Sequence, residues 1–268
     1  MSNIEIGLWS FPVLLFLIFI RVPIGAAMLI TGIGGTWLVT GRWAVVMSQM
    51  KAMTWSNFSS YSLSIIPLFL LMGQFAARGG MSQSLFNAAA AFLGHRKGGV
   101  AMAAIGASAG FGSICGSSLA TAATMAQAAL PELRKYGYSG ALATGTLAAG
   151  GTLGILIPPS INMIIYAVLT DTSVADLYAA GFIPGFLLAG LFSLMVLGLA
   201  LYRPEWAGPK VDIADLWRQR VAGLRHLIPP LGLFLVVVGS IYAGIATPTE
   251  AAALGLMATL GLVAANRQ

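Results

Sequence analysis

The chain has 268 residues, of which 58% are hydrophobic and only 8% are charged, against about 25% in an ordinary soluble domain. So few charges exclude a water-soluble globule of this size, because its surface would need far more Lys, Arg, Glu and Asp. The net charge of +6 does not indicate nucleic-acid binding, since the basic residues stand singly or in pairs between apolar runs and form no basic face. The sequence therefore predicts an all-α polytopic membrane protein that lies in a lipid bilayer.

The first part of the chain alternates apolar runs with polar segments. Leu8–Ile20 and Ile24–Thr40 predict two helices joined by a tight turn, and Ile65–Ala77 predicts a third, shorter span, so residues 8–78 are interpreted as scaffold helices. Between them, residues 42–64 mix charged, hydroxyl and Trp side chains, which is typical of a segment in the membrane interface. Residues 81–97 have apolar side chains at helical spacing among polar ones, and they predict an amphipathic arm helix along the interface.

Residues 98–136 are apolar but are interrupted near their middle by the glycine-rich stretch Gly110–Ser118. The arms on either side, Val100–Ala109 and Leu119–Leu133, are each too short at about 1.5 Å per residue for a hydrocarbon core of about 30 Å. Both outer ends carry a pair of basic residues, which places both ends on the same side of the membrane if basic loops are cytoplasmic. The pattern predicts a re-entrant helical hairpin with a polar tip at mid-membrane depth.

Residues 139–169 predict a discontinuous helix, broken at Gly150–Gly154 and again at Pro158–Ser160. The simpler alternative is that the glycines only permit tight helix packing and that the prolines only produce a kink. Two polar breaks in neighbouring segments, one of them at a hairpin tip, favour a functional site over that alternative.

A continuous helix is predicted over residues 174–202, followed by a basic connecting loop over residues 203–226. With a non-crossing hairpin and an N-terminus outside the cytoplasm, all basic residues except Arg42 and Lys51 fall on the cytoplasmic side, including those of the connecting loop. This asymmetry supports the predicted orientation.

Two stretches resemble each other, Arg21–Leu29 and Ala246–Leu254, each a Pro-led turn between apolar helices followed by small residues. On the predicted topology they point in opposite directions, as in the inverted repeats of transporters. We therefore divide the chain into a first inverted repeat (residues 1–202), the connecting loop (203–226) and the start of a second repeat (227–268).

Few titratable groups converge within the apolar segments. His95 and His226 each stand near an arginine at a predicted helix end, which is typical of solvated caps and not of catalysts or metal ligands. Cys115 lies near Ser113 and Ser117 but has no base close to it in the sequence. A membrane enzyme with a Cys or Ser nucleophile is therefore the weaker hypothesis, and no organic cofactor is expected.

The polar groups that remain within the hydrophobic layer are hydroxyl and backbone groups. Unwound backbone frees carbonyl oxygens, and these together with Ser and Thr hydroxyls form the hard-oxygen shell that a sodium ion requires. The half-helices that begin after Ser117 and after Pro159 expose N–H groups, which attract anions. The two breaks therefore offer groups that suit a sodium ion and an anion.

Four motifs make the sequence recognisable: Ser62–Gly73, Gly112–Thr121, Gly151–Ser160 and Gly244–Ala251. In this order they resemble the large, DctM-like membrane subunit of tripartite ATP-independent periplasmic (TRAP) transporters. The resemblance implies a sodium-driven, elevator-type importer of an organic acid, commonly a C4-dicarboxylate, in a bacterial inner membrane. It also implies two partners, a small four-helix membrane subunit and a periplasmic substrate-binding protein.

The resemblance further implies which residues bind. It places the sodium ion near Ser113, Gly116, Ser117, Thr152, Gly154 and Pro158, and the solute near Ser118, Thr121, Pro159 and Ser160. Family members have a second half with another hairpin and another broken helix, so we expect this chain to be truncated early in its second repeat. The alternative function is accordingly that of a non-transporting membrane fragment or an interaction subunit.

Overall fold

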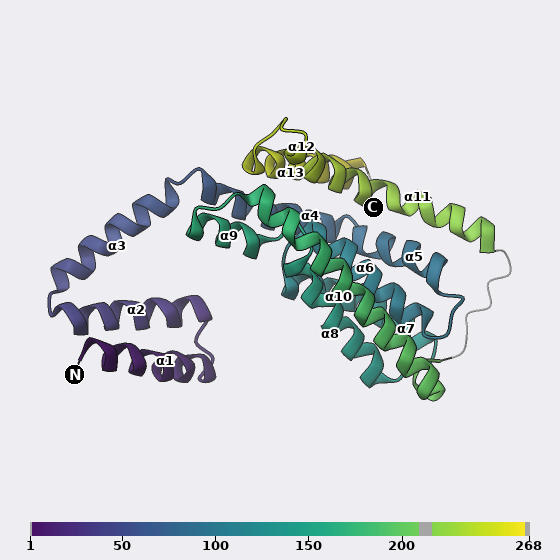
Figure 1. The fold of residues 1–268 in the computed structure, drawn as a ribbon, viewed down its shortest axis with the longest axis horizontal. Helices are drawn as coiled ribbons and strands as arrows, with labels where there is room; N and C mark the ends of the chain where they lie inside the picture. The colour runs from purple at the N-terminus through teal and green to yellow at the C-terminus, as the bar shows by residue number, and fades with distance from the viewer. Residues whose placement is uncertain (1, 209–215, 266–268) are drawn as a thin grey trace. The chain divides into compact units, whose positions relative to one another are not determined.

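The structure is a computed structural model that describes residues 2–208 and 216–265 (Figure 1). All regular elements of these residues are helices, which confirms the predicted all-α class. Contacts divide the chain into two units, Met1–Ser60 and Tyr61–Gln268, and each unit is described by itself.

The first unit consists of α1 (Asn3–Phe19), α2 (Ile24–Thr40) and α3 (Trp43–Phe58). Helix α1 begins with a capping box, because the Ser2 hydroxyl accepts from the Glu5 N–H while the Glu5 carboxylate accepts from the Ser2 N–H. Helix α2 packs against both other helices. The segment expected in the membrane interface thus contains a regular helix, α3.

The second unit begins with a 3₁₀ turn, η1 (Ser62–Ser64), and continues with seven helices. These are α4 (Ile65–Arg78), α5 (Met81–Leu93), α6 (Gly99–Cys115), α7 (Ser118–Lys135), α8 (Gly140–Leu156), α9 (Ile161–Thr170) and α10 (Val174–Tyr202). After the turn η2 (Pro204–Trp206) come α11 (Leu216–Phe234), the π-helical turn η3 (Leu235–Gly239), α12 (Ser240–Tyr242) and α13 (Pro248–Ala265). Helix α10 has the bounds expected from the sequence.

Helix α6 is the centre of the second unit. It packs against α5, α8, α10, α7 and α4, and all its residues except Gly106 and Gly110 are buried. Its many Ala and Gly residues allow neighbouring helices to approach closely, which is how membrane helices gain packing energy without a hydrophobic driving force. This central position fixes the C-terminal end of α6, where the hairpin turns.

Four described helical segments are long and apolar enough to cross a membrane: 140–170, α10, 220–242 and α13. Helices α4 and α5 pass the same test only together, with a bend of 63° between them, while α1, α2 and α6 are apolar but shorter. By length and composition, therefore, the described part of the chain fits a multi-pass membrane protein.

The hairpin differs from its expected form. Residues 110–115 belong to α6, so the break contains only Gly116 and Ser117, and the expected ten-residue first arm is wrong. The two arms have 17 and 18 residues, so at 1.5 Å per residue they reach about 26 and 27 Å, close to the thickness of a hydrocarbon core. The arms pack against each other as a helical hairpin.

The discontinuous helix is also broken over a shorter stretch than expected. Gly150–Gly154 lies within α8, and only residues 157–160 interrupt the helix, so the first of the two predicted breaks is wrong. The physical reason is packing: a Cβ at Gly150 would lie 2.7 Å from the Ser108 hydroxyl oxygen, and one at Gly151 would lie 2.6 Å from the Ala122 Cβ. These glycines allow close helix contacts and do not unwind α8.

Two further boundaries differ from the sequence interpretation. The predicted connecting loop 203–226 contains the start of α11, which is helical from Leu216, while residues 209–215 of that loop lie outside the described residues. The arm helix α5 ends at Leu93, whereas residues 81–97 were expected; it packs against α6, α7 and α11, and its apolar side chains Leu85 and Phe86 are buried. The division into inverted repeats stays a prediction.

Candidate functional site

The two helix breaks of the second unit meet at a backbone hydrogen bond. The Ile161 N–H, at the start of α9, donates to the Gly116 carbonyl oxygen in the hairpin turn, with an N···O distance of 3.2 Å. Gly116 has a φ of 65° and ends α6 by donating its own N–H to the Gly112 carbonyl at 2.8 Å. A Cβ at Gly116 would lie 3.1 Å from the Ile161 nitrogen and 3.2 Å from the Pro159 oxygen. Both the left-handed backbone and the close approach of α9 therefore favour glycine at this position.

Replacing Gly116 by alanine tests this contact. The left-handed backbone costs about 1–2 kcal/mol for an L-residue. Gly244→Ala carries the same cost without the contact, since Gly244 has a φ of 68° and a Cβ there would have no neighbour within 4 Å. We expect Gly116→Ala to lower the thermal midpoint of the purified chain further than Gly244→Ala does. The additional loss in the free energy of unfolding should be about 1 kcal/mol or more. Equal losses in the two variants would contradict the close contact.

The serines that precede α7 and α9 have different roles. The Ser117 hydroxyl accepts weakly from the Ala120 N–H, at 3.5 Å, and so caps α7. Ser160 is fully buried, and its hydroxyl donates instead to the Ile155 carbonyl at 2.8 Å, across the break. Helix α9 consequently has no side-chain cap, and the first-turn N–H groups of Asn162 and Met163 have no partner among the described residues. The start of α9 is thus open to an anion.

Helix α8 approaches the hairpin most closely at Gly154. A Cβ there would lie 2.7 Å from the Thr121 hydroxyl oxygen and 3.1 Å from the Ser117 carbonyl oxygen. Thr121 is fully buried, and its hydroxyl makes no hydrogen bond, although the Cys115 thiol lies near it without hydrogen-bond geometry. A buried hydroxyl without a partner is unusual, because leaving it unpaired costs about 1–3 kcal/mol. Thr121 therefore has unused hydrogen-bonding capacity at the junction of the two breaks.

The structure brings most of the predicted binding residues together. The residues that lie buried or half-buried at the junction are Gly116, Ser117, Ser118, Thr121, Gly154, Pro158, Pro159 and Ser160. Ser113 is buried one turn earlier, where its hydroxyl donates to the Gly110 carbonyl at 2.8 Å. Thr152 is exposed, and its hydroxyl donates to the Ala149 carbonyl at 2.7 Å. Both of these hydroxyls are thus engaged by their own helices.

The sequence interpretation missed glycines that hold the site together. A Cβ at Gly112 would lie 2.6 Å from the Gly154 Cα, so α6 and α8 are in backbone contact there. A Cβ at Gly73 would lie 3.0 Å from the Cys115 sulfur and 3.1 Å from its Cα, so α4 supports the end of α6. The four-residue spacings of Gly112 with Gly116 and of Gly150 with Gly154 are the small-residue pattern that could have indicated these contacts.

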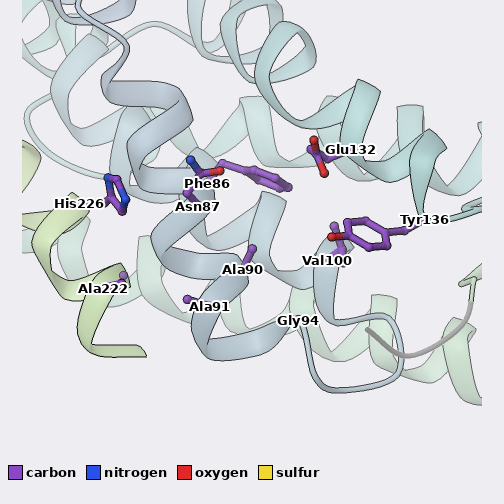
Figure 2. A pocket seen from close by; sticks show the side chains of 11 residues that line it. Phe86, Asn87, Ala90, Ala91, Gly94, Val100, Glu132, Tyr136, Ala222 and His226 are labelled. Atoms are coloured by element: carbon purple, nitrogen blue, oxygen red, sulfur yellow. The ribbon is translucent and has the colours of Figure 1, made fainter. Parts of the chain in front are cut away.

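A separate cavity of about 290 Å³ lies between α5, the start of α6, the end of α7 and α11. Figure 2 shows His226 and Asn87 on one side of the Phe86 ring, and Glu132 and Tyr136 on the other. No residue predicted to bind sodium or solute lines this cavity. His226 lies within α11, and the expectation that it caps a helix end is wrong.

The comparisons with known proteins agree on one family. Residues 11–268 match the model of the tripartite ATP-independent periplasmic transporter, DctM component. The chain is 41% identical over 194 residues to the C4-dicarboxylate TRAP transporter large permease protein DctM of Pseudomonas aeruginosa, covering 72% of this chain and 44% of that protein. It is 34% identical over 258 residues to the DctM protein of Rhodobacter capsulatus, covering 91% of this chain and 57% of that protein.

A third relative is the sialic acid TRAP transporter permease protein SiaT of Haemophilus influenzae. It is 34% identical over 238 residues, which cover 89% of this chain and 38% of SiaT. The chain spans about half the length of the curated relatives it matches.

Proposed function

Because this chain belongs to the DctM family of tripartite ATP-independent periplasmic transporter components, we propose that it forms a solute-translocating part of a large permease subunit. It is a multi-pass protein of the inner membrane. The relatives with named functions are permeases and not enzymes, so the nucleophilic-enzyme hypothesis has no support. We further propose that the solute is an organic acid, since the relatives include transporters for C4-dicarboxylates and sialic acid, both of which carry carboxylates.

The observation that carries the proposal is the hydrogen bond from Ile161 to Gly116, which joins the two helix breaks. Helices α6 and α8 both end there, and the last carbonyls of a helix carry partial negative charge, which favours a cation. Helices α7 and α9 both begin there, and their N–H groups favour an anion. One junction thus offers suitable groups to a sodium ion and to a carboxylate side by side.

We propose that Ser113, Gly116, Ser117, Thr152, Gly154 and Pro158 supply oxygens to sodium, and that Ser118, Thr121, Pro159 and Ser160 contact the solute. Among these, Thr152 contributes least, because its side chain is exposed and bonded within α8. The mutual packing of α6, α7 and α8 suits a rigid body that moves as a whole, as an elevator mechanism requires.

The proposal includes two partners, a small membrane subunit and a periplasmic binding protein. It also includes an orientation with a periplasmic N-terminus and cytoplasmic residues 203–226, for which the uneven distribution of basic residues is the support.

Ser117→Ala tests the sodium site, with Ser139→Ala as its matched control. Both serines are N-caps, because Ser139 accepts from the Leu142 N–H at 3.2 Å just as Ser117 accepts from Ala120, so each variant loses about 1 kcal/mol of helix capping. A ligand that binds only the folded chain raises its thermal midpoint. We expect the wild type and Ser139→Ala to have a higher thermal midpoint in NaCl than in KCl at the same concentration. For Ser117→Ala, we expect the same rise in midpoint to require at least a tenfold higher NaCl concentration.

Two results would contradict the proposal. Equal midpoints in NaCl and KCl for the wild type would mean that the chain does not bind sodium specifically. An unchanged sodium response in Ser117→Ala would place the ion elsewhere. A chain that binds the small membrane subunit but neither sodium nor solute would instead support the interaction-subunit alternative.

A further inference from the structure

A polar cavity lies between α4, α5 and α7, away from the residues proposed to bind sodium. Its volume is about 420 Å³, within the range of about 300–1,000 Å³ that is usual for small-molecule sites. Two of its lining residues are alanines and the others are polar, namely Gln74, Arg78, Ser82, Gln83, Thr124 and Gln127. No acidic residue lines it. The cavity therefore combines one positive charge with neutral hydrogen-bonding groups.

Two of these side chains have unused hydrogen-bonding capacity. Arg78, in the last turn of α4, forms no ion pair with any described residue. Ser82 is only 6% exposed, yet its hydroxyl makes no hydrogen bond to the described part of the chain. Gln83, by contrast, is held in place because its amide N–H donates to the Asn87 side-chain oxygen at 3.0 Å. The exposed Arg78 guanidinium, without an ion pair, and the hydroxyl of the buried Ser82, without a hydrogen bond to the described residues, thus line the same cavity.

The start of α5 adds to the positive potential of this cavity. Its N-cap, Gly80, provides no side-chain cap, so the N–H groups of the first turn, from Met81 to Gln83, are not satisfied by the helix. The positive end of the helix dipole lies there, beside the Arg78 guanidinium. An anion in the cavity would be stabilised by both, and it would supply the acceptors that Ser82 and Arg78 lack.

The cavity and the proposed solute site both include residues of α7. Thr124, which lines the cavity, follows Thr121 by three residues and therefore lies one helical turn further from the hairpin tip. Thr121 has the unpaired buried hydroxyl at the junction of the two breaks. The polar face of α7 thus leads from the hairpin tip toward its basic outer end, with the cavity on the way.

We propose that this cavity is a second binding site for a carboxylate group of the transported solute. The solute would occupy it on the way between the hairpin tip and the basic end of the hairpin. The binding groups are those of Gln74, Arg78, Ser82, Gln83, Thr124 and Gln127. The proposal rests on the function proposed above and adds a second solute-binding site along the translocation route. A carboxylate fits better than a phosphate, because the lining offers one positive charge and several neutral donors.

The test measures carboxylate binding to the full chain in phosphatidylcholine nanodiscs. The probes are succinate, ectoine and N-acetylneuraminate, which represent the solutes in the names of the relatives. We expect at least one probe to bind, with a dissociation constant at least tenfold higher in Arg78→Gln, about threefold higher in Gln127→Leu, and unchanged in Arg134→Gln. Arg134 is a matched control, because it is an exposed arginine in the last turn of α7 that does not line the cavity.

The outcomes separate this proposal from the sodium-coupled function. A sodium response in the wild type together with equal probe binding in the wild type and Arg78→Gln would overturn only the cavity proposal. Failure of all three probes to bind would overturn the cavity proposal and would also contradict an organic acid as the solute. If NaCl does not raise the thermal midpoint of the wild type above that in KCl, the function proposed above is wrong. If phosphatidylglycerol added to the nanodiscs binds in an Arg78-dependent way while the probes do not, the cavity is a lipid site and the proposal is wrong.

Discussion

Gly112→Ala is expected to destabilise the chain strongly. The added Cβ would lie 2.6 Å from the Gly154 Cα and 3.0 Å from its nitrogen, so only a shift of backbone can relieve the clash. Helices α6 and α8 would have to separate where both reach the junction of the two breaks. Overpacking of this kind costs about 1–3 kcal/mol and occasionally more. Thermal unfolding of the purified chain in detergent measures the effect.

Gly106→Ala is the control for that variant, on the same helix. Gly106 is exposed, and a Cβ there would have no neighbour within 4 Å. Alanine favours the helix over glycine, so this variant should be more stable than the wild type by about 0.4–1 kcal/mol. The two substitutions are chemically identical and should shift the midpoint in opposite directions. If Gly112→Ala proves as stable as Gly106→Ala, α6 and α8 are not in backbone contact.

Thr121→Val should separate stability from function. Valine has nearly the shape of threonine but lacks the hydroxyl, which is fully buried and has no hydrogen-bond partner. Removing it relieves an unpaired polar group, so the free energy of unfolding should stay the same or rise by about 1 kcal/mol. If the hydroxyl binds solute, uptake by the assembled transporter in proteoliposomes should fall at least tenfold, and Thr121→Ser should restore most of it.

The chain offers a closely matched control in Thr146 of α8. Its hydroxyl is likewise buried and unpartnered, but Thr146 lies in the first half of α8, far along the helix from Gly154. Thr146→Val should therefore give a similar gain in stability without a change in uptake. An equal loss of uptake in both variants would show that the effect arises from packing, and full uptake by Thr121→Val would remove Thr121 from the solute site.

The positions of the helix breaks were predicted only in part from the sequence pattern. Glycine disfavours a helix by about 1 kcal/mol relative to alanine, so stretches such as Gly110–Cys115 and Gly150–Gly154 suggested breaks. Both are helical in the structure, because Gly112, Gly150, Gly151 and Gly154 lie where α6, α7 and α8 approach too closely for a Cβ. Tertiary packing outweighs local propensity there. The breaks at Gly116 and at Pro158–Ser160 agree with the sequence prediction, since glycine adopts the left-handed turn that ends a helix and consecutive prolines disfavour one. Consecutive prolines do not suffice by themselves, because Pro229 and Pro230 lie within α11.

The candidate site was predictable as a set of residues but not as a geometry. The family resemblance implied that Ser117, Thr121 and Ser160 belong to one site, whereas their hydrogen-bonding states could not be derived from the sequence. The Ser160 hydroxyl is engaged across the break, the Thr121 hydroxyl is unpaired, and the Thr152 side chain is exposed. Each state depends on which residue of another helix lies opposite. The Arg78 cavity has the same origin, because three helices contribute to it and no local pattern links them.

By itself, the sequence determined that this chain is a helical membrane protein, because composition and the length of apolar runs depend only on the residues present, and its four motifs carried the resemblance to a transporter family. It also determined the limits of helices such as Ile24–Thr40 and Val174–Tyr202, where polar or helix-ending residues bound a long apolar run. Only the tertiary structure decided which glycines are contacts and which are turns, and which hydroxyls remain available. Those properties depend on distances of a few ångströms between helices, and such distances are fixed by packing across the whole second unit.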